Sequence, residues 1–108
     1  MASVFNPAHA EELSYELQKE RSYYSKLSSD ACEGDSIAYM TLKTDAVDDD
    51  NPVAMNSLAW LYLTENCVFE NQGVAYAVAL QLESADAGYP IAINNYANRL
   101  MKGHGNPP

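Results

Sequence analysis

The fold is decided by DNPVA at residues 50–54, which returns 38 residues later as GYPIA at residues 88–92. Sliding the chain by this distance lays 37–63 on 75–101 and brings like residues together. The identical pairs are Leu42 with Leu80, Asp48 with Asp86, Pro52 with Pro90, Ala54 with Ala92, Asn56 with Asn94, and Ala59 with Ala97. A fixed period of this length is typical of proteins whose repeating unit is a helical hairpin.

Helix-start and helix-stop signals divide the chain into five segments. Asn6-Pro7 and Asn51-Pro52 each place an N-cap residue before a proline at the first helical position. Gly34 and Gly88 are the expected stops. Apolar residues recur at helical spacing between these signals. We therefore expect a single all-α domain over 1–108, with a frayed tail at 104–108. Its helices are expected at about 7–32, 35–47, 52–64, 73–87 and 90–102.

Three stretches resemble a SEL-like repeat, which belongs to the alanine- and glycine-rich branch of the tetratricopeptide-like helical repeats. They are AMNSLAWLY at 54–62, VAY at 74–76 and ESADAGYPIA at 83–92. The resemblance covers one repeat, about 52–89, and a partial repeat on each side. Ala59 departs from the usual glycine, and Val74-Ala75 departs from the usual lysine-alanine. The resemblance implies a short right-handed α-solenoid of two and a half hairpins that scaffolds protein complexes, with no chemistry of its own.

The charge of the chain restricts its partners. Fifteen acidic residues against six basic ones give a net charge of −9. This argues against direct binding to nucleic acid or to an anionic membrane, and it allows a basic protein partner. The longest strongly apolar stretch, 58–63, is far shorter than the roughly 20 residues of a membrane span. Residues 1–7 lack the pattern of a secretory signal, so we expect a cytoplasmic protein.

Catalytic and metal-binding signals are weak. Cys32 and Cys67 form no CxxC pair, and His9 and His104 give no zinc spacing. We expect two buried, reduced thiols, with a disulfide as the alternative. The sequence has no glycine-rich phosphate loop, no nucleophile elbow and no HExxH motif. We therefore predict no enzyme activity, no cofactor and no metal.

A protein-binding groove is the first candidate site. In solenoids of the resembled family, the first helix of each hairpin lines the concave face. The positions predicted to lie there are Asn56 and Trp60 in the third helix and Asn94 and Asn98 in the fifth. An offset of 45 residues, seven more than the period, adds Tyr15 from a first helix lengthened by two turns. Asparagine amides can hold a peptide backbone, and aromatic anchors dominate binding energy. The alternative is that Trp60 belongs to the core and the asparagines are solvated.

An acidic edge is the second candidate site, formed by Asp45, Asp48, Asp49 and Asp50. It could clamp lysines or arginines of a basic partner, or mimic a row of phosphates. The alternative is a solvated turn whose acids are favoured by the start of the next helix.

Three functional hypotheses follow. The first is a non-catalytic protein–protein interaction module that binds through the groove or the acidic edge. The second is an acidic neutralising inhibitor, such as an immunity protein, an antitoxin or a phage anti-defence protein, that blocks a basic nuclease or a nucleic-acid-binding complex. The third is a self-assembling structural module, with a homodimer through Ile91, Tyr96 and Leu100 of the fifth helix.

Overall fold

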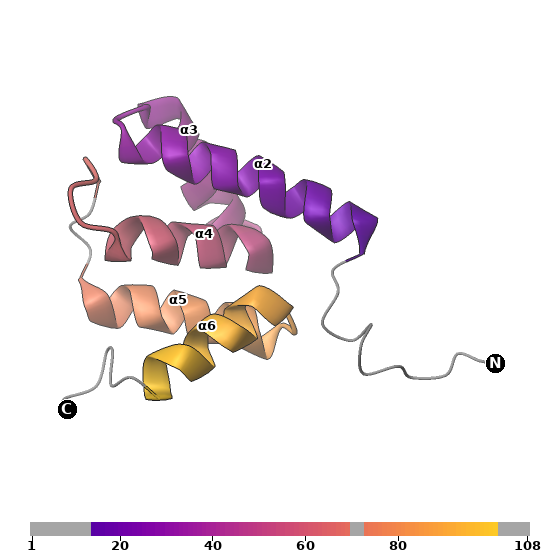
Figure 1. Cartoon of the computed structure of the whole chain (residues 1–108). Coiled ribbons are helices and arrows are strands. Elements are labelled where there is room, and N and C mark those ends of the chain that lie inside the picture. Colours follow the sequence, from indigo (N-terminus) through magenta and orange to yellow (C-terminus); the bar gives the residue numbers. More distant parts are fainter. Residues whose placement is uncertain (1–13, 70–72, 102–108) are drawn as a thin grey trace.

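Helices form most of residues 14–69 and 73–101, which are the residues that the computed structural model describes (Figure 1). The elements are α2 (Tyr15–Cys32), α3 (Ser36–Lys43), the π-helical turn η1 (Thr44–Asp48), α4 (Pro52–Leu63), α5 (Val74–Asp86) and α6 (Pro90–Met101). These two ranges contain no strand. The all-α prediction is therefore confirmed, whereas the right-handed solenoid stays a prediction.

The helix bounds repeat with the period of the sequence. Ser36, Asp48, Pro52 and Leu63 lie 38 residues before Val74, Asp86, Pro90 and Met101. Thus α3 with η1 is the counterpart of α5, and α4 is the counterpart of α6. The turns match as well, because Asp50 and Gly88 both have a positive φ, of 54° and 92°. Each stands two residues before the proline that begins the next helix. The sequence period is therefore also a period of the structure.

The expected caps begin α3 and α4. The side chain of Asp35 accepts hydrogen bonds from the backbone N–H groups of Ile37 and Ala38, both at 3.0 Å. Asn51 caps α4 in the same way, accepting from the second and third residues of that helix at 2.9 and 3.1 Å. Gly34 has a φ of 110°, a left-handed conformation that ends α2 with little strain. Local capping chemistry thus sets these boundaries.

The first described helix begins later than the sequence predicted. Ser14 has an extended backbone, and its side chain accepts a hydrogen bond from the N–H of Leu17 at 3.1 Å. The helix expected over about 7–32 is therefore interrupted, and α2 begins at Tyr15. Residues 7–13, like the tail at 104–108, lie outside the described part. Counting 38 residues back from Pro52 reaches Ser14, so the extra length of α2 lies at its C-terminal end. The offset of 45 residues therefore does not describe α2.

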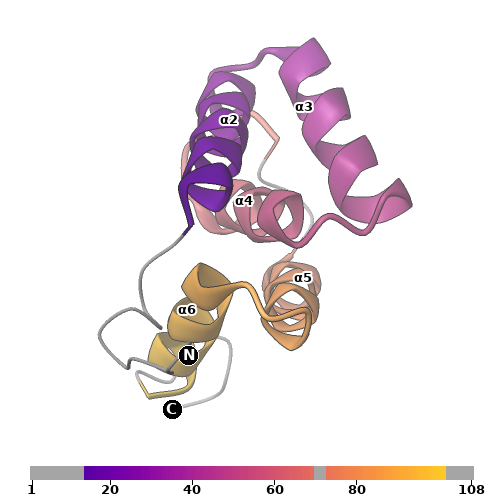
Figure 2. The ribbon, with the colours of Figure 1, turned by 90° about the vertical axis from the view of Figure 1, so that its right-hand side faces the viewer.

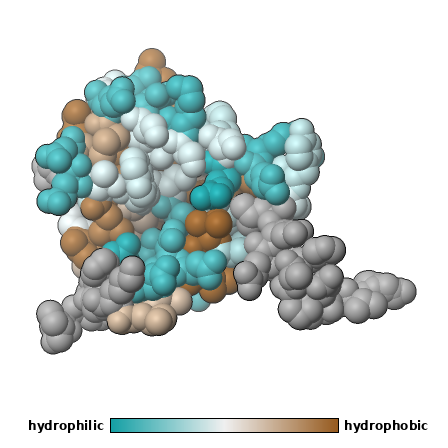
Figure 3. Space-filling model, in the orientation of Figure 1, coloured by the Kyte–Doolittle hydropathy of each residue, from teal (hydrophilic) through white to brown (hydrophobic). Residues whose placement is uncertain are grey.

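The core is centred on α4, which packs against α2, α3, η1 and α5, while α6 packs against α5 (Figure 2). Seven consecutive residues of α4, from Val53 to Ala59, are buried. A helix buried on every side has no need of a polar face, which explains the apolar sequence of α4. Leu42, Leu58 and Leu61 are among the largest fully buried side chains. On the face in Figure 3, hydrophobic side chains reach the surface in separate places among hydrophilic ones.

A disulfide joins Cys32 at the end of α2 to Cys67 in the loop after α4. The expectation of two reduced thiols is therefore wrong for this structure. The two cysteines lie 35 residues apart, and tertiary packing brings them together. The backbone N–H of Val68 also donates to the carbonyl oxygen of Cys32 at 3.0 Å. The ring of Phe69 stacks on Tyr39 of α3, with ring centroids 4.3 Å apart. These contacts anchor residues 64–69 on the α2–α3 hairpin.

Candidate functional site: a groove between α2, α4 and α6

A hollow of about 170 Å³ lies where α2, α4 and the start of α6 meet. We call it the groove. Its lining residues are Arg21, Ser25 and Ser28 of α2, Asn56, Ser57 and Trp60 of α4, and Tyr89, Ile91 and Asn95 at α6. Three segments that are far apart in the sequence therefore contribute to one surface.

The α4 side of the groove contains two of the predicted residues. Asn56 and Trp60 are four residues apart and so share one helix face. Asn56 is almost fully buried, and its Oδ1 accepts a hydrogen bond from Nδ2 of Asn95 at 3.4 Å. The side chain of Trp60 is 44% exposed. The alternative that Trp60 belongs to the core is therefore excluded, and Asn56 is not a solvated surface residue.

The α2 side of the groove supplies a cation. Arg21 is exposed and forms no ion pair with any described acid, whereas Lys19 and Lys26 pair with acids of their own helix. Burial raises the pKa of the Tyr89 hydroxyl, and the positive charge of Arg21 partly opposes this increase. The groove therefore has a positively charged side although the chain as a whole is strongly acidic.

The other predicted groove residues lie elsewhere. Tyr15 projects into solvent, where its ring lies 4.8 Å from Nζ of Lys19. Asn94 and Asn98 are exposed on α6 and do not line the groove; Asn95 does. The reason is the rotation of α6 about its axis. Nε of Arg99 donates to Oε1 of Gln81 on α5 at 3.0 Å, which turns the face of Asn95 and Arg99 toward the body of the protein.

Sequence reasoning missed three groove residues on α2: Arg21, Ser25 and Ser28. They follow one another at intervals of four and three residues, which places them on one face of a helix. This polar stripe was the signal that could have revealed them. The 45-residue offset hid it, because it assigned the wrong register to α2.

The acidic edge is smaller than predicted. Oδ2 of Asp45 accepts a hydrogen bond from the Tyr24 hydroxyl at 2.7 Å, and Asp45 is half-buried. Burial and this contact raise the pKa of Tyr24. Asp48, Asp49 and Asp50 are exposed and pair with no described cation. Three exposed acids at the turn between η1 and α4 therefore form the edge.

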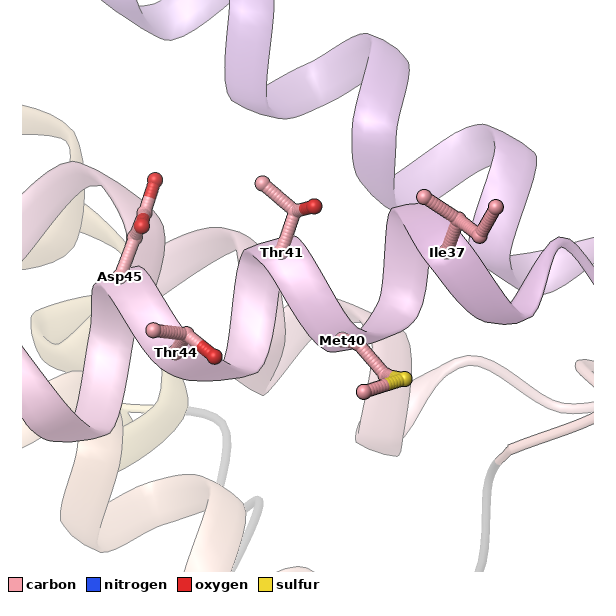
Figure 4. A pocket seen from close by; sticks show the side chains of 5 residues that line it. All are labelled: Ile37, Met40, Thr41, Thr44 and Asp45. Carbon is pink, nitrogen blue, oxygen red and sulfur yellow. The ribbon is translucent and has the colours of Figure 1, made fainter.

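A second hollow, of about 380 Å³, lies on the outer side of α3 and η1 (Figure 4). Its lining residues are Ile37, Met40, Thr41, Thr44 and Asp45. All five come from one continuous stretch of helix, and Ile37 and Met40 are strongly exposed. This hollow is therefore an open helix surface and not a cleft between elements.

Comparison with protein-family models, with curated protein sequences and with solved structures gives no match. Within the described ranges, no helix has the length and apolar character needed to cross a membrane. The same ranges contain no group of three or more histidine, cysteine, aspartate or glutamate side chains that could hold a metal ion. The groove is therefore interpreted from its own residues.

Proposed function

We propose that this protein is a non-catalytic interaction module whose groove holds a short segment of a partner protein. One observation carries the proposal. Arg21, Asn56 and Trp60 come from two helices and face the same hollow. They combine a cation, a nearly buried amide and an exposed aromatic ring. Such a combination can receive a carbonyl or carboxylate oxygen next to an apolar side chain.

The size of the groove supports a protein ligand. Pockets that enclose a small organic ligand usually measure about 300–1,000 Å³, and the groove measures about 170 Å³. It has room for one side chain or one chain end. A peptide segment that places a single anchor residue in the groove, and extends over the rim beyond it, fits these dimensions.

Trp60 is the residue on which the binding energy is expected to depend most. Tryptophan is enriched among residues whose truncation costs about 2 kcal/mol or more of binding free energy. A loss of this size weakens the affinity by about 30-fold. Trp60 is also the sole tryptophan of the chain, so its fluorescence reports the groove without interference from a second indole.

The test compares three proteins: the wild type, Trp60→Ala, and Ile37→Ala as a matched control. Ile37 is also an exposed apolar residue, but it lies on the outer side of α3. Each chain is immobilised and offered native lysate, and the captured partner is then purified. We expect Trp60→Ala to weaken its affinity by about 30-fold and Ile37→Ala to leave it unchanged. Equal affinity of the wild type and Trp60→Ala would refute the groove proposal.

A second candidate function rests on the acidic edge. Three consecutive exposed aspartates on a chain of net charge −9 suit an inhibitor that covers the cationic site of a basic nuclease or nucleic-acid-binding complex. An immunity protein, an antitoxin or a phage anti-defence protein acts in this way. Its affinity would fall steeply with salt. Changing Asp48, Asp49 and Asp50 together to asparagine would abolish binding, and Trp60→Ala would not affect it.

The finer fold assignment belongs to the same proposal. The 38-residue spacing of the helix bounds and the packing of α2 on both α3 and α4 support a SEL-like solenoid. The disulfide bears on the location of the protein. Disulfides persist mainly in oxidising compartments, so the cross-link favours such a compartment over the cytoplasm. Counting free thiols in protein trapped directly from cells decides between the two.

A further inference from the structure

An uncovered apolar stripe runs along α6. It consists of Ile93, Tyr96, Ala97 and Leu100, and we call it the α6 stripe. The intervals of three, four and seven residues place these side chains on one helix face. Ile93 is 47% exposed and Leu100 is 51% exposed. Within the described part of the chain, no helix packs over this face.

The counterpart of the α6 stripe on α4 is fully covered. Its members, 38 residues earlier, are Met55, Leu58, Ala59 and Tyr62, and all four are buried. Met55 shares a hollow with Tyr76 and Leu80 of α5. The ring of Tyr62 lies 5.7 Å from that of Tyr76. In the preceding repeat, the same pattern of side chains is therefore a helix-packing face, and α5 is the helix that covers it.

We propose that a second copy of this chain covers the α6 stripe, with the two α6 helices antiparallel across a two-fold axis. The stripe is symmetric about the point between Tyr96 and Ala97. In the antiparallel arrangement, Ile93 of one copy therefore faces Leu100 of the other. Ala97 stands at the centre, where a small side chain lets the two helices approach closely. A two-fold interface requires this kind of self-complementarity.

The charge distribution favours this occupant. The chain has a net charge of −9, yet α6 contains no acidic residue. Its one charged side chain, Arg99, is hydrogen-bonded to Gln81 of α5 and so is directed toward its own copy. Two copies can therefore bring their α6 stripes together without placing like charges in the contact.

Stacking of copies end to end is disfavoured by α2. The exposed residues of α2 are mostly polar or charged, and its two exposed aromatic residues, Tyr15 and Tyr23, stand eight positions apart. This surface offers no apolar counterpart for the α6 stripe. The pair is therefore closed.

The residues of the contact differ from those predicted from the sequence. Ile91 is half-buried and lines the groove, so it does not belong to the exposed face. Tyr96 and Leu100 remain, and Ile93 and Ala97 join them. Pairing through the α6 stripe leaves Arg21 and Trp60 accessible in the groove. Dimer formation and partner binding are therefore separable properties.

The contact is small. A helix of 12 residues is about 18 Å long, and two such helices with their neighbours bury less surface than the roughly 1,200–2,000 Å² of a stable complex. We therefore expect a reversible dimer with a dissociation constant on the order of micromolar.

Sedimentation equilibrium on the full chain, from about 1 to about 300 μM, tests the proposal on either side of that constant. The wild type is expected to pass from monomer to dimer over this range. Leu100→Glu would bury an unpaired carboxylate in each half of the contact, so we expect the dissociation constant to rise at least about 100-fold. Met40→Glu is the matched control, because Met40 is 64% exposed on α3 and receives the same charge. It is expected to dimerise like the wild type.

A second variant and one spectroscopic measurement protect the test from unfolding artefacts. Ala97→Glu places the charge on another exposed member of the α6 stripe and is expected to give the same loss. Circular dichroism must show wild-type helicity for every variant that is compared. A wild type that stays monomeric up to the highest concentration overturns the proposal. Dimerisation of Leu100→Glu and Ala97→Glu at the wild-type constant, or loss of the dimer in Met40→Glu, also overturns it.

Discussion

Reduction of the Cys32–Cys67 disulfide is expected to cost this protein a large share of its stability. The bond closes a loop with a sequence separation of 35 residues. Opening the loop returns conformational freedom to the unfolded chain. For a loop of this size the chain-entropy relation gives about 4 kcal/mol, between the values of about 3 and about 4.7 kcal/mol for loops of 15 and 100 residues. Domains of this class have a total free energy of unfolding of about 5–15 kcal/mol.

The assay is urea unfolding followed by circular dichroism, with and without dithiothreitol. We expect the free energy of unfolding to fall by about 4 kcal/mol on reduction. In a thermal scan the same loss corresponds to a decrease in Tm of at least about 15 °C. The control is the double variant Cys32→Ser, Cys67→Ser, whose stability must not respond to the reductant. Identical unfolding curves for the oxidised and reduced wild type, or two titratable thiols per chain before reduction, would refute the reasoning.

The remaining predictions concern pH, capping and packing. Burial raises the pKa of Tyr24, Tyr62 and Tyr89 above the ordinary value near 10. The folded state therefore retains protons that the unfolded state releases above about pH 10, and stability should fall by up to about 1.4 kcal/mol per pH unit for each tyrosine; a urea midpoint equal at about pH 8 and about pH 11 would contradict this. Asn51→Ala removes the α4 cap and the 2.8 Å hydrogen bond to Oε2 of Glu20. We expect it to cost about 1–2 kcal/mol in urea unfolding, against no change for a substitution at an exposed, uncapped position. Leu58→Ala leaves a cavity at a fully buried site of α4 and is expected to cost about 2–5 kcal/mol; a smaller loss in the same assay would show that α4 is loosely packed.

Local signals in the sequence were sufficient for much of the fold. The bounds of α3 with η1, α4 and α5 agree with the predicted ranges within about a residue, because each is set by its own cap or stop. Asp35 and Asn51 bond to the N–H groups that their positions implied. The start of α2 was missed because two capping signals compete there. Asn6-Pro7 has the stronger pattern, yet Ser14 begins the helix that the structure describes.

The groove depended on information that no local pattern contains. Trp60 and Asn56 were placed correctly on one face, because residues four apart on a helix always share a face. The partners that α2 and α6 contribute depend on the rotation of each helix about its axis. That rotation is set by contacts such as Arg99 with Gln81. The disulfide was missed for a similar reason, since a separation of 35 residues leaves no local trace.

The disulfide also makes the chain mechanically uneven. When the two ends are pulled apart, force bypasses the 35-residue loop and passes from Cys32 to Cys67 through the covalent bond. The contour length that can be released is then shorter by about 120 Å, taking about 3.4 Å per extended residue. α3, η1 and α4 lie inside the shielded loop, whereas α5 and α6 lie outside it and bear the load directly. Under oxidising conditions an applied force therefore extends the α5–α6 hairpin fully and leaves the loop from Cys32 to Cys67 closed.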